Sequence, residues 1–264
     1  MQAWDLVIAG SCALVAVLLA WPVPIALSRA AWPPFHPVAA LLLWQGIALA
    51  GGFTMIGALW LVGAALVPAH PWLAGIPAMA LAVYLLAHLA AAVVSFERQR
   101  RRHLSLLSLL SVPDPDRART RVLDDAAPVA YCLPRGVGSV TVLSRGLLDD
   151  LAPDELAAVM AHERAHVEQR HEVLLVAFKA WRRALPWFPI AARAESEVAA
   201  LVEMLADDVA RRALAAEVAA PDEVLARAIL RVARSGSLGT DRSERASSRR
   251  DRMHDRFRRL RPGA

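Results

Sequence analysis

Lysine, tyrosine and cysteine are scarce in this chain of 264 residues. Lys179 is the only lysine, so arginine supplies nearly all of the positive charge. The two cysteines, Cys12 and Cys132, lie far apart in the sequence, and Cys12 belongs to an apolar segment. This spacing argues against a disulfide framework and favours a reducing compartment for the soluble part of the chain.

Hydrophobic residues, in contrast, make up 56% of the sequence, and the formal net charge is +5. The mean hydropathy is +0.38. That value is high for a soluble domain and indicates segments that span a membrane.

Three long apolar runs predict three transmembrane helices, at about residues 6–27, 38–67 and 72–95, within a membrane region of residues 1–97. The second run has no charged residue and, at ~1.5 Å per residue, is longer than the ~30 Å hydrocarbon core. It must therefore tilt, kink or emerge, and Gly51-Gly52 is the expected place for a bend. The first run lacks a basic n-region, so we expect an uncleaved anchor rather than a signal peptide.

The distribution of arginine predicts the orientation in the membrane. The third run is directly followed by residues 97–102, with the sequence ERQRRR, whereas the loop at 68–71 has no lysine or arginine. Loops rich in lysine and arginine stay on the cytoplasmic side. We therefore expect a multi-pass protein of the cell membrane, with its N-terminus outside and everything after Arg98 in the cytoplasm.

The region after the membrane helices begins with a basic juxtamembrane segment and linker at residues 98–120. A short helix is expected near 104–112, and the sequence VPDP ends it. Apolar or β-branched stretches at 121–123, 129–133 and 140–143 then predict a small antiparallel sheet, with a turn at 134–138.

Helical patterns dominate the rest of the chain. Pro153 suits a first helical position, and further helices are expected at 195–214 and 221–233. The predicted fold is thus an α-helical membrane region of three helices and an α+β domain at 121–233. An Arg-rich flexible tail is expected at 234–264. Because acids are interspersed in it, we expect it to be solvated and do not expect a nucleic-acid partner.

Three of the eight histidines lie in the sequence MAHERAHVEQRH, which begins at Met160. His162 and His166 enclose Glu163 in the pattern H-E-x-x-H. Residues four apart lie on the same face of a helix, so both imidazoles can reach one zinc ion. Glu163 is then placed to take a proton from a water molecule that the ion activates. The pattern predicts a metal site on this helix.

Such a site needs a third protein ligand. Glu203 and Asp207 lie four residues apart on the next long helix, in the sequence EMLAD. Glu203 is the predicted third ligand, and Asp207 is predicted to accept a hydrogen bond from a ligand histidine. The alternative is a pair of exposed acids, which would repel one another. The apolar residues around them indicate a buried helix and favour the ligand role.

Other candidate ligands fit less well. His171 follows His166 by five residues, whereas the metzincin pattern requires six and a glycine, so His171 is predicted to be a polar residue near the helix end. His88 is predicted to be a buried residue of the membrane region. The remaining candidates that we favour less are His70, Glu195, Glu197 and Asp208. For the oxyanion donor, Arg211, Arg212 and His171 stay open.

A family resemblance rests on these residues. Three apolar runs, then LAPDELAAVMAHERAHVEQRH at residues 151–171 and EMLADDVA from Glu203, resemble the membrane zinc metallopeptidases of the BlaR/MecR antirepressor family. The soluble part is also similar to gluzincins of the CAAX prenyl protease and HtpX type. The resemblance implies a zincin-like domain with one catalytic Zn²⁺ on His162, His166 and Glu203. It also implies Glu163 as general base and Asp207 as a supporting residue.

The resemblance further implies an integral-membrane zinc endopeptidase that cleaves a cytoplasmic or membrane-proximal protein, with a winged-helix repressor as the family's precedent. BlaR-type receptors carry an additional span and an extracellular sensor domain, for which the Arg-rich tail leaves no room. We therefore expect a relative without the sensor. The alternatives are an HtpX-like quality-control or processing protease and a non-catalytic membrane signalling adaptor. The oligomeric state is not given by the sequence.

Overall fold

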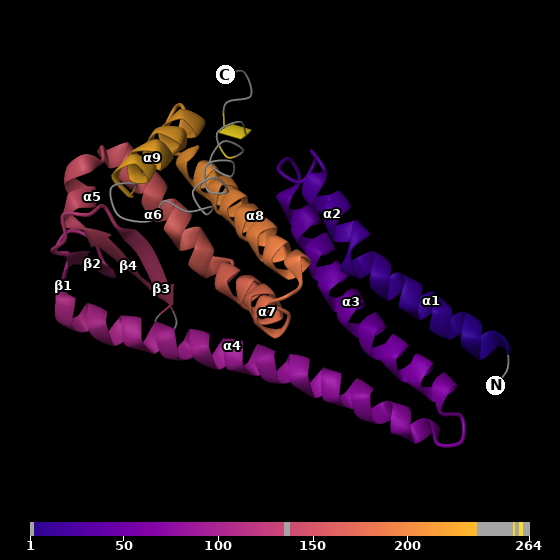
Figure 1. The fold of residues 1–264 in the computed structure, drawn as a ribbon. Coiled ribbons are helices and arrows are strands. Elements are labelled where there is room, and N and C mark those ends of the chain that lie inside the picture. Colours follow the sequence, from indigo (N-terminus) through magenta and orange to yellow (C-terminus); the bar gives the residue numbers. More distant parts are fainter. Residues whose placement is uncertain (1–2, 135–137, 237–255, 257–258, 261–264) are drawn as a thin grey trace. The chain divides into compact units, whose positions relative to one another are not determined.

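The computed structural model describes residues 3–134, 138–236, 256 and 259–260. Within these residues the chain is mostly helical and has a small sheet (Figure 1). It divides into two compact units. The first comprises residues 1–96 and 174–201, and the second comprises residues 97–173 and 202–264.

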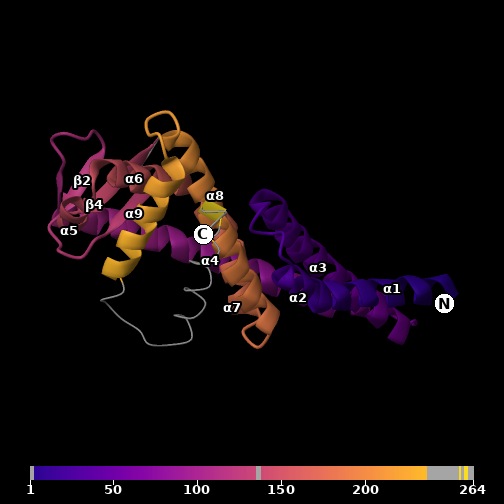
Figure 2. The same ribbon diagram turned by 90° about the horizontal axis from the view of Figure 1, so that it is seen from above.

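The first unit is built mainly from apolar helices. They include α1 (Ala3–Ala20), α2 (Pro22–Arg29), α3 (Pro37–Leu66), the 3-10 helix η1 (Pro71–Ala74) and the first part of α4 (Gly75–Leu110). α1 lies beside α3 in both views (Figure 1, Figure 2). By length and composition, three stretches can cross a membrane, namely Val7–Arg29, Pro37–Leu66 and Trp72–Leu110. The prediction of three membrane helices is thus confirmed for the described residues.

The helix boundaries differ from the predicted ones in the first and the third run. A break at Trp21 divides the first run into α1 and α2, because Pro22 disfavours helical backbone in the residue before it. α3 is one continuous helix through Gly51-Gly52, and its bounds agree with the predicted second run within one residue at each end. α4 continues to Leu110, so most of the predicted juxtamembrane segment is helical and continuous with the third span.

Two further helices contribute to the first unit: α7 (His171–Ala184), from Leu174 onward, and the first part of α8 (Pro189–Leu214). α7 packs on α4 through a small apolar cluster of Ala92, Phe96, Val176 and Ala180. The Tyr84 hydroxyl donates a hydrogen bond to the carbonyl of Ala184 at 2.7 Å. These contacts attach α7 to α4 beside the apolar helices.

The second unit contains a four-stranded sheet in the order β1-β2-β4-β3. Its strands are β1 (Ser111–Pro113), β2 (Thr120–Leu123), β3 (Ala130–Pro134) and β4 (Ser139–Ser144). β4 is an inner strand, and its Val142 and Leu143 have no exposed surface. β3 forms the edge next to β4.

The sheet is mixed, which corrects the predicted antiparallel arrangement. β3 pairs with β4 in antiparallel fashion, but β2 pairs with β4 in parallel, with Thr120 opposite Thr141. β1 adds a strand where the sequence predicts the end of a helix and a linker. Sequence patterns favour pairing between consecutive strands, whereas β2 pairs with the strand after next. The predicted turn lies mostly outside the described residues.

Helix α6 (Pro153–Glu168) carries the histidine pair and lies between the sheet and α9 (Pro221–Gly236). Leu143 of β4 and Leu147 of α5 (Arg145–Asp150) pack with Leu156 of α6 in a buried cluster. A second cluster joins α6 to α8 and α9 through Ala158, Ala210 and other buried residues. These two clusters fix α6 by apolar packing on both sides.

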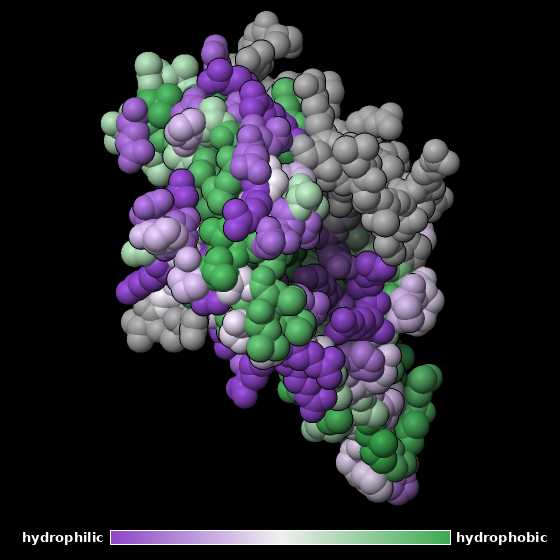
Figure 3. All heavy atoms as spheres, turned by 90° about the vertical axis from the view of Figure 1, so that its left-hand side faces the viewer, coloured by the Kyte–Doolittle hydropathy of each residue, from purple (hydrophilic) through white to green (hydrophobic). Residues whose placement is uncertain are grey.

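On the face of the molecule that carries the sheet, hydrophobic side chains are interrupted by many hydrophilic ones (Figure 3).

Gly146 allows α5 to approach the loop before β3. A Cβ at this position would lie 1.9 Å from the carbonyl oxygen of Ala126, far inside van der Waals contact. We therefore expect Gly146→Ala to destabilise the protein by about 1–3 kcal/mol through overpacking. The midpoint of thermal unfolding measures the effect. Gly57→Ala is the control, because a Cβ there meets nothing within 4 Å. Equal midpoints for the two variants would contradict the close approach.

Candidate metal centre

The start of α6 is held by a buried carboxylate. Pro153 occupies the first helical turn, and Asp154 and Glu155 lie at the positive end of the helix dipole. Glu155 Oε2 accepts a hydrogen bond from the Ala152 N–H at 3.1 Å and lies 3.4 Å from Arg231 Nη1. Glu155 is only 2% exposed, so these contacts fix the N-terminal turn from which the histidine pair projects.

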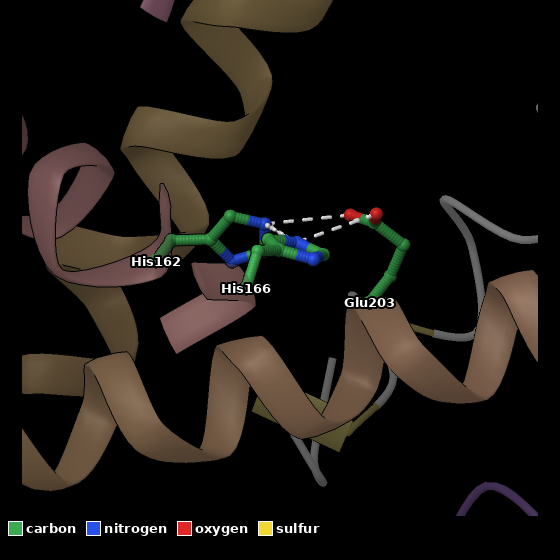
Figure 4. Close-up of side chains that lie close together, drawn as sticks. All are labelled: His162, His166 and Glu203. Carbon is green, nitrogen blue, oxygen red and sulfur yellow. Dashed lines mark hydrogen bonds and ion pairs between the residues drawn. The ribbon is translucent and has the colours of Figure 1, made fainter. Parts of the chain in front are cut away.

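Three side chains converge from α6 and α8 (Figure 4). His162 Nε2 and His166 Nε2 lie 3.1 Å apart. The Glu203 carboxylate faces both rings, with Oε2 3.4 Å from His162 Nε2 and Oε1 3.5 Å from His166 Nε2. All three ligand atoms lie within 4.8 Å of one another. Two imidazole nitrogens and one carboxylate oxygen form the donor set of a catalytic zinc site, so these residues fit the predicted metal.

Asp207 lies behind His162. Its Oδ1 is 2.9 Å from His162 Nδ1, and its side chain is only 3% exposed. A carboxylate at this nitrogen fixes the tautomer that carries the proton on Nδ1 and leaves Nε2 free to bind a metal. The structure therefore brings Asp207 to the place where the sequence analysis expects a supporting residue.

His171 lies behind His166. The sequence did not predict this contact. His171 Nδ1 is 3.1 Å from His166 Nδ1, and His171 Nε2 is 2.8 Å from Gln169 Oε1. His171 is 1% exposed, so it is not the polar residue near the helix end that the sequence predicts. When His166 Nδ1–H donates to His171 and His171 Nε2–H donates to Gln169, the Nε2 of His166 is left free for a metal.

We expect His171→Ala to lower zinc affinity by about 10–100-fold, because it removes the group that orients the ring of His166. Competition with a chromophoric chelator measures the affinity. His103→Ala is the control, since His103 is exposed on α4. An unchanged zinc affinity in the His171→Ala variant would show that the contact does not orient the ring.

Glu163 is half-buried next to His162. Burial raises the pKa of the Glu163 carboxyl to about 7, although the charge of His162 acts in the opposite direction. A carboxyl group with a pKa near neutrality can both accept and release a proton under physiological conditions. This property suits the general base that the sequence analysis predicts at Glu163.

The two histidines differ in their protonation without metal. Burial lowers the pKa of His166 to about 4, so its ring is neutral at physiological pH. Burial also lowers the pKa of His162, but its hydrogen bonds with Asp207 and Glu203 outweigh this effect and raise the pKa to about 9. Burial raises the pKa of Glu203, and its hydrogen bond with His162 and the charge of Arg256 bring it down to about 2. The metal-free site therefore holds a proton on His162 near neutral pH.

Two arginines from the predicted tail also contact α8. Arg256 Nε lies 2.6 Å from Asp207 Oδ2, and Arg256 Nη1 lies 3.3 Å from Glu203 Oε2. Arg259 Nη2 lies 2.8 Å from Asp208 Oδ2. The sequence predicts a solvated tail. At these two residues the prediction is wrong, because their guanidinium groups pair with carboxylates of α8. The spacing of charges within the tail gives no signal for pairing at such long range.

The other candidates from the sequence lie outside the convergent group of the described residues. Glu195 pairs with Arg182 at 3.0 Å, and Asp208 pairs with Arg259. Arg211 lies 3.9 Å from Asp208. The candidate ligands that also lie outside this group are His70, His88 and Glu197.

A comparison with known families gives a match to part of the chain. Residues 95–202 match the model of peptidase family M48. The matched segment includes His162, Glu163 and His166 and stops one residue before Glu203. Peptidases of family M48 depend on zinc, which agrees with the donor set of the site. The match supports a membrane metallopeptidase, and the narrower resemblance to the BlaR/MecR family stays a prediction.

A curated protein is similar to this chain over part of its length. A segment of 86 residues is 30% identical to "Protease HtpX homolog 2" of Methanosarcina mazei. The aligned segment is 32% of this chain and 29% of that relative, so the chain spans less than a third of the relative it matches. No solved structure matches the chain.

Proposed function

We propose that this protein is an integral-membrane zinc endopeptidase whose metal is held by His162, His166 and Glu203. The observation that carries the proposal is the convergence of three ligand atoms within 4.8 Å, two from an H-E-x-x-H helix and one from α8. The M48 match over residues 95–202 and the three membrane-length helical stretches support it.

The chain's own residues supply the proton transfers. Zinc, when bound, would lower the pKa of a water molecule and polarise the carbonyl of the scissile peptide bond. Glu163, with its pKa raised to about 7, accepts the proton of the attacking water and passes it to the departing amine. His162 and His166 stay oriented because Asp207 and His171 occupy their Nδ1 atoms.

The edge strand β3 is the proposed site for the substrate backbone. β3 is at the end of the sheet order and contacts α6, the helix that carries Glu163. An extended peptide can add to such an edge through main-chain hydrogen bonds, which do not depend on its side chains. This arrangement suits the cleavage of an unfolded or extended segment of a protein.

The proposed location is based on the distribution of arginine, and the proposed substrate class is based on the family resemblance. The arginines after the third span favour a multi-pass protein of the cell membrane with its N-terminus outside and its peptidase domain, at 121–233, in the cytoplasm. A cytoplasmic or membrane-proximal protein is the proposed substrate class. A winged-helix repressor is the specific candidate, on the resemblance to the BlaR/MecR family, and an HtpX-like role in quality control or processing is the alternative.

The test is the metal content of the purified full-length protein together with peptide cleavage before and after chelation. The proposal expects about one zinc per chain, loss of cleavage on chelation, and recovery when zinc is returned. A protein that binds no zinc and cleaves no peptide would instead favour a non-catalytic membrane adaptor.

Zinc affinity should depend on pH, because the metal-free site holds a proton on His162. The pKa of that imidazole is raised to about 9, so zinc must displace the proton near neutral pH. We expect the affinity to rise by about tenfold per pH unit between pH of about 7 and about 9. Without zinc, the same contacts contribute stability that is complete below the usual pKa of 6.5 and is lost as pH rises through about 9. Affinity that stays flat over this range would contradict the protonated His162.

A further inference from the structure

Arg256, one of the described residues of the predicted tail, contacts two carboxylates of the site directly. Its Nε and Nη2 lie 2.6 and 2.7 Å from the two carboxylate oxygens of Asp207. Its Nη1 lies 3.3 Å from Glu203 Oε2. One guanidinium group therefore touches both the proposed third ligand and the carboxylate behind the first ligand.

The guanidinium of Arg256 is well enclosed. Its side chain is 14% exposed and that of Asp207 is 3% exposed. Asp207 Oδ1 receives the Arg256 Nη2–H and also lies 2.9 Å from His162 Nδ1. The chain of contacts thus runs from Arg256 through Asp207 to His162, and directly from Arg256 to Glu203.

Two other described residues near Arg256 in the sequence, Arg259 and Leu260, contact α8 and the core. Arg259 Nη2 lies 2.9 and 2.8 Å from the two carboxylate oxygens of Asp208, and Arg259 Nη1 donates to the Met204 carbonyl at 3.3 Å. Leu260 is 8% exposed and packs in the cluster that joins α6, α8 and α9. These contacts join Arg259 and Leu260 to α8 and the core, and they do not touch the ligand atoms.

We propose that Arg256 is a positioning residue of the metal site, which sets the orientation of Glu203 and, through Asp207, of His162. The proposal rests on the proposed function, since it concerns the same metal ligands. The planar guanidinium has five N–H donors in a fixed fork, so it can hold two carboxylates in one relative orientation. It also reduces the repulsion between two carboxylates that lie one turn apart on α8.

Arg256 and Arg259 separate this role from mere attachment of the C-terminal region. Both pair with acids of α8, but only Arg256 contacts Glu203 and Asp207. Arg256→Met and Arg259→Met each remove one charge and keep a long apolar side chain. Arg256→Lys keeps the charge and loses the fork.

The experiment measures zinc affinity of the full-length variants by competition with a chromophoric chelator, and checks folding by circular dichroism. We expect Arg256→Met to bind zinc about 10–100-fold more weakly than the wild type. Arg256→Lys should recover part of the affinity, and Arg259→Met should remain close to the wild type. If only Arg256→Met loses its helical signal, the folded Arg256→Lys variant decides. The proposal then requires that Arg256→Lys binds zinc more weakly than the wild type.

Two results would overturn the proposal. If Arg256→Met and Arg256→Lys both have the zinc affinity of the wild type, the contact does not orient the ligands. An equal loss in Arg259→Met would show that attachment of the segment, and not the fork of Arg256, is what matters. Absence of zinc from the wild type itself would reject the proposed function, which is a separate outcome.

Discussion

Replacing Glu163 by glutamine is expected to lower the rate of peptide cleavage by about 10²–10⁴-fold while zinc stays bound. Glutamine has nearly the same shape but cannot accept a proton, so the general base is removed without disturbing His162, His166 or Glu203. Burial raises the pKa of Glu163 to about 7, which gives the wild-type carboxyl the affinity for a proton that glutamine lacks.

The assay is cleavage of a mixed peptide library, followed by mass spectrometry, together with the zinc content of each variant. Glu168→Gln is the matched control, because Glu168 lies exposed at the end of the same helix. Full activity in the Glu163→Gln variant would reject the proposed mechanism. Loss of activity together with loss of zinc would mean that Glu163 supports the metal and does not only move a proton.

Replacing Glu203 by alanine is expected to remove zinc and activity together. Glu203 is the only carboxylate in the convergent group of the described residues, with its oxygens 3.4 and 3.5 Å from the two histidine nitrogens. Loss of one of three protein ligands should weaken zinc binding by more than the roughly 10–100-fold that is typical of an outer residue. The variant also leaves the positive charge of Arg256 with one carboxylate fewer.

Zinc content after dialysis measures this effect. Glu195→Ala is the control on the same helix, because Glu195 pairs with Arg182 at 3.0 Å and lies outside the convergent group. A Glu203→Ala variant that retained stoichiometric zinc would mean that another side chain is the third ligand. The contrast with Glu163→Gln, which should keep zinc and lose activity, separates the ligand from the general base.

Much of the membrane region was predictable, since its signal is local. Uninterrupted apolar sequence of sufficient length predicts a span wherever it occurs, and the three spans correspond to three membrane-length helical stretches. The ends of these helices were less predictable. The charged residues at 97–102 mark the end of the apolar run, but they do not predict that the helix continues to Leu110.

The histidine pair was also predictable, because residues four apart must share a face on any helix. The prediction that Glu203 and Asp207 lie at the site required an assumption about which helix packs against α6. The structure brings both of them to the pair, whereas their roles as ligand and supporting residue remain predictions. The contact of His171 was missed because Arg170, with a φ of 51°, turns the chain just after the end of α6 and so places His171 behind His166.

The sequence by itself determined the membrane helices, the small α+β domain and the H-E-x-x-H pair, because each depends on spacing within a single element. Only the tertiary structure decided that β2 pairs in parallel with β4, that His171 contacts His166, and that Arg256 contacts Glu203 and Asp207. These contacts join residues that are distant in the sequence or separated by a turn. These contacts depend on how the elements pack and on which charged residues pair with each other. Local sequence patterns do not encode either of these.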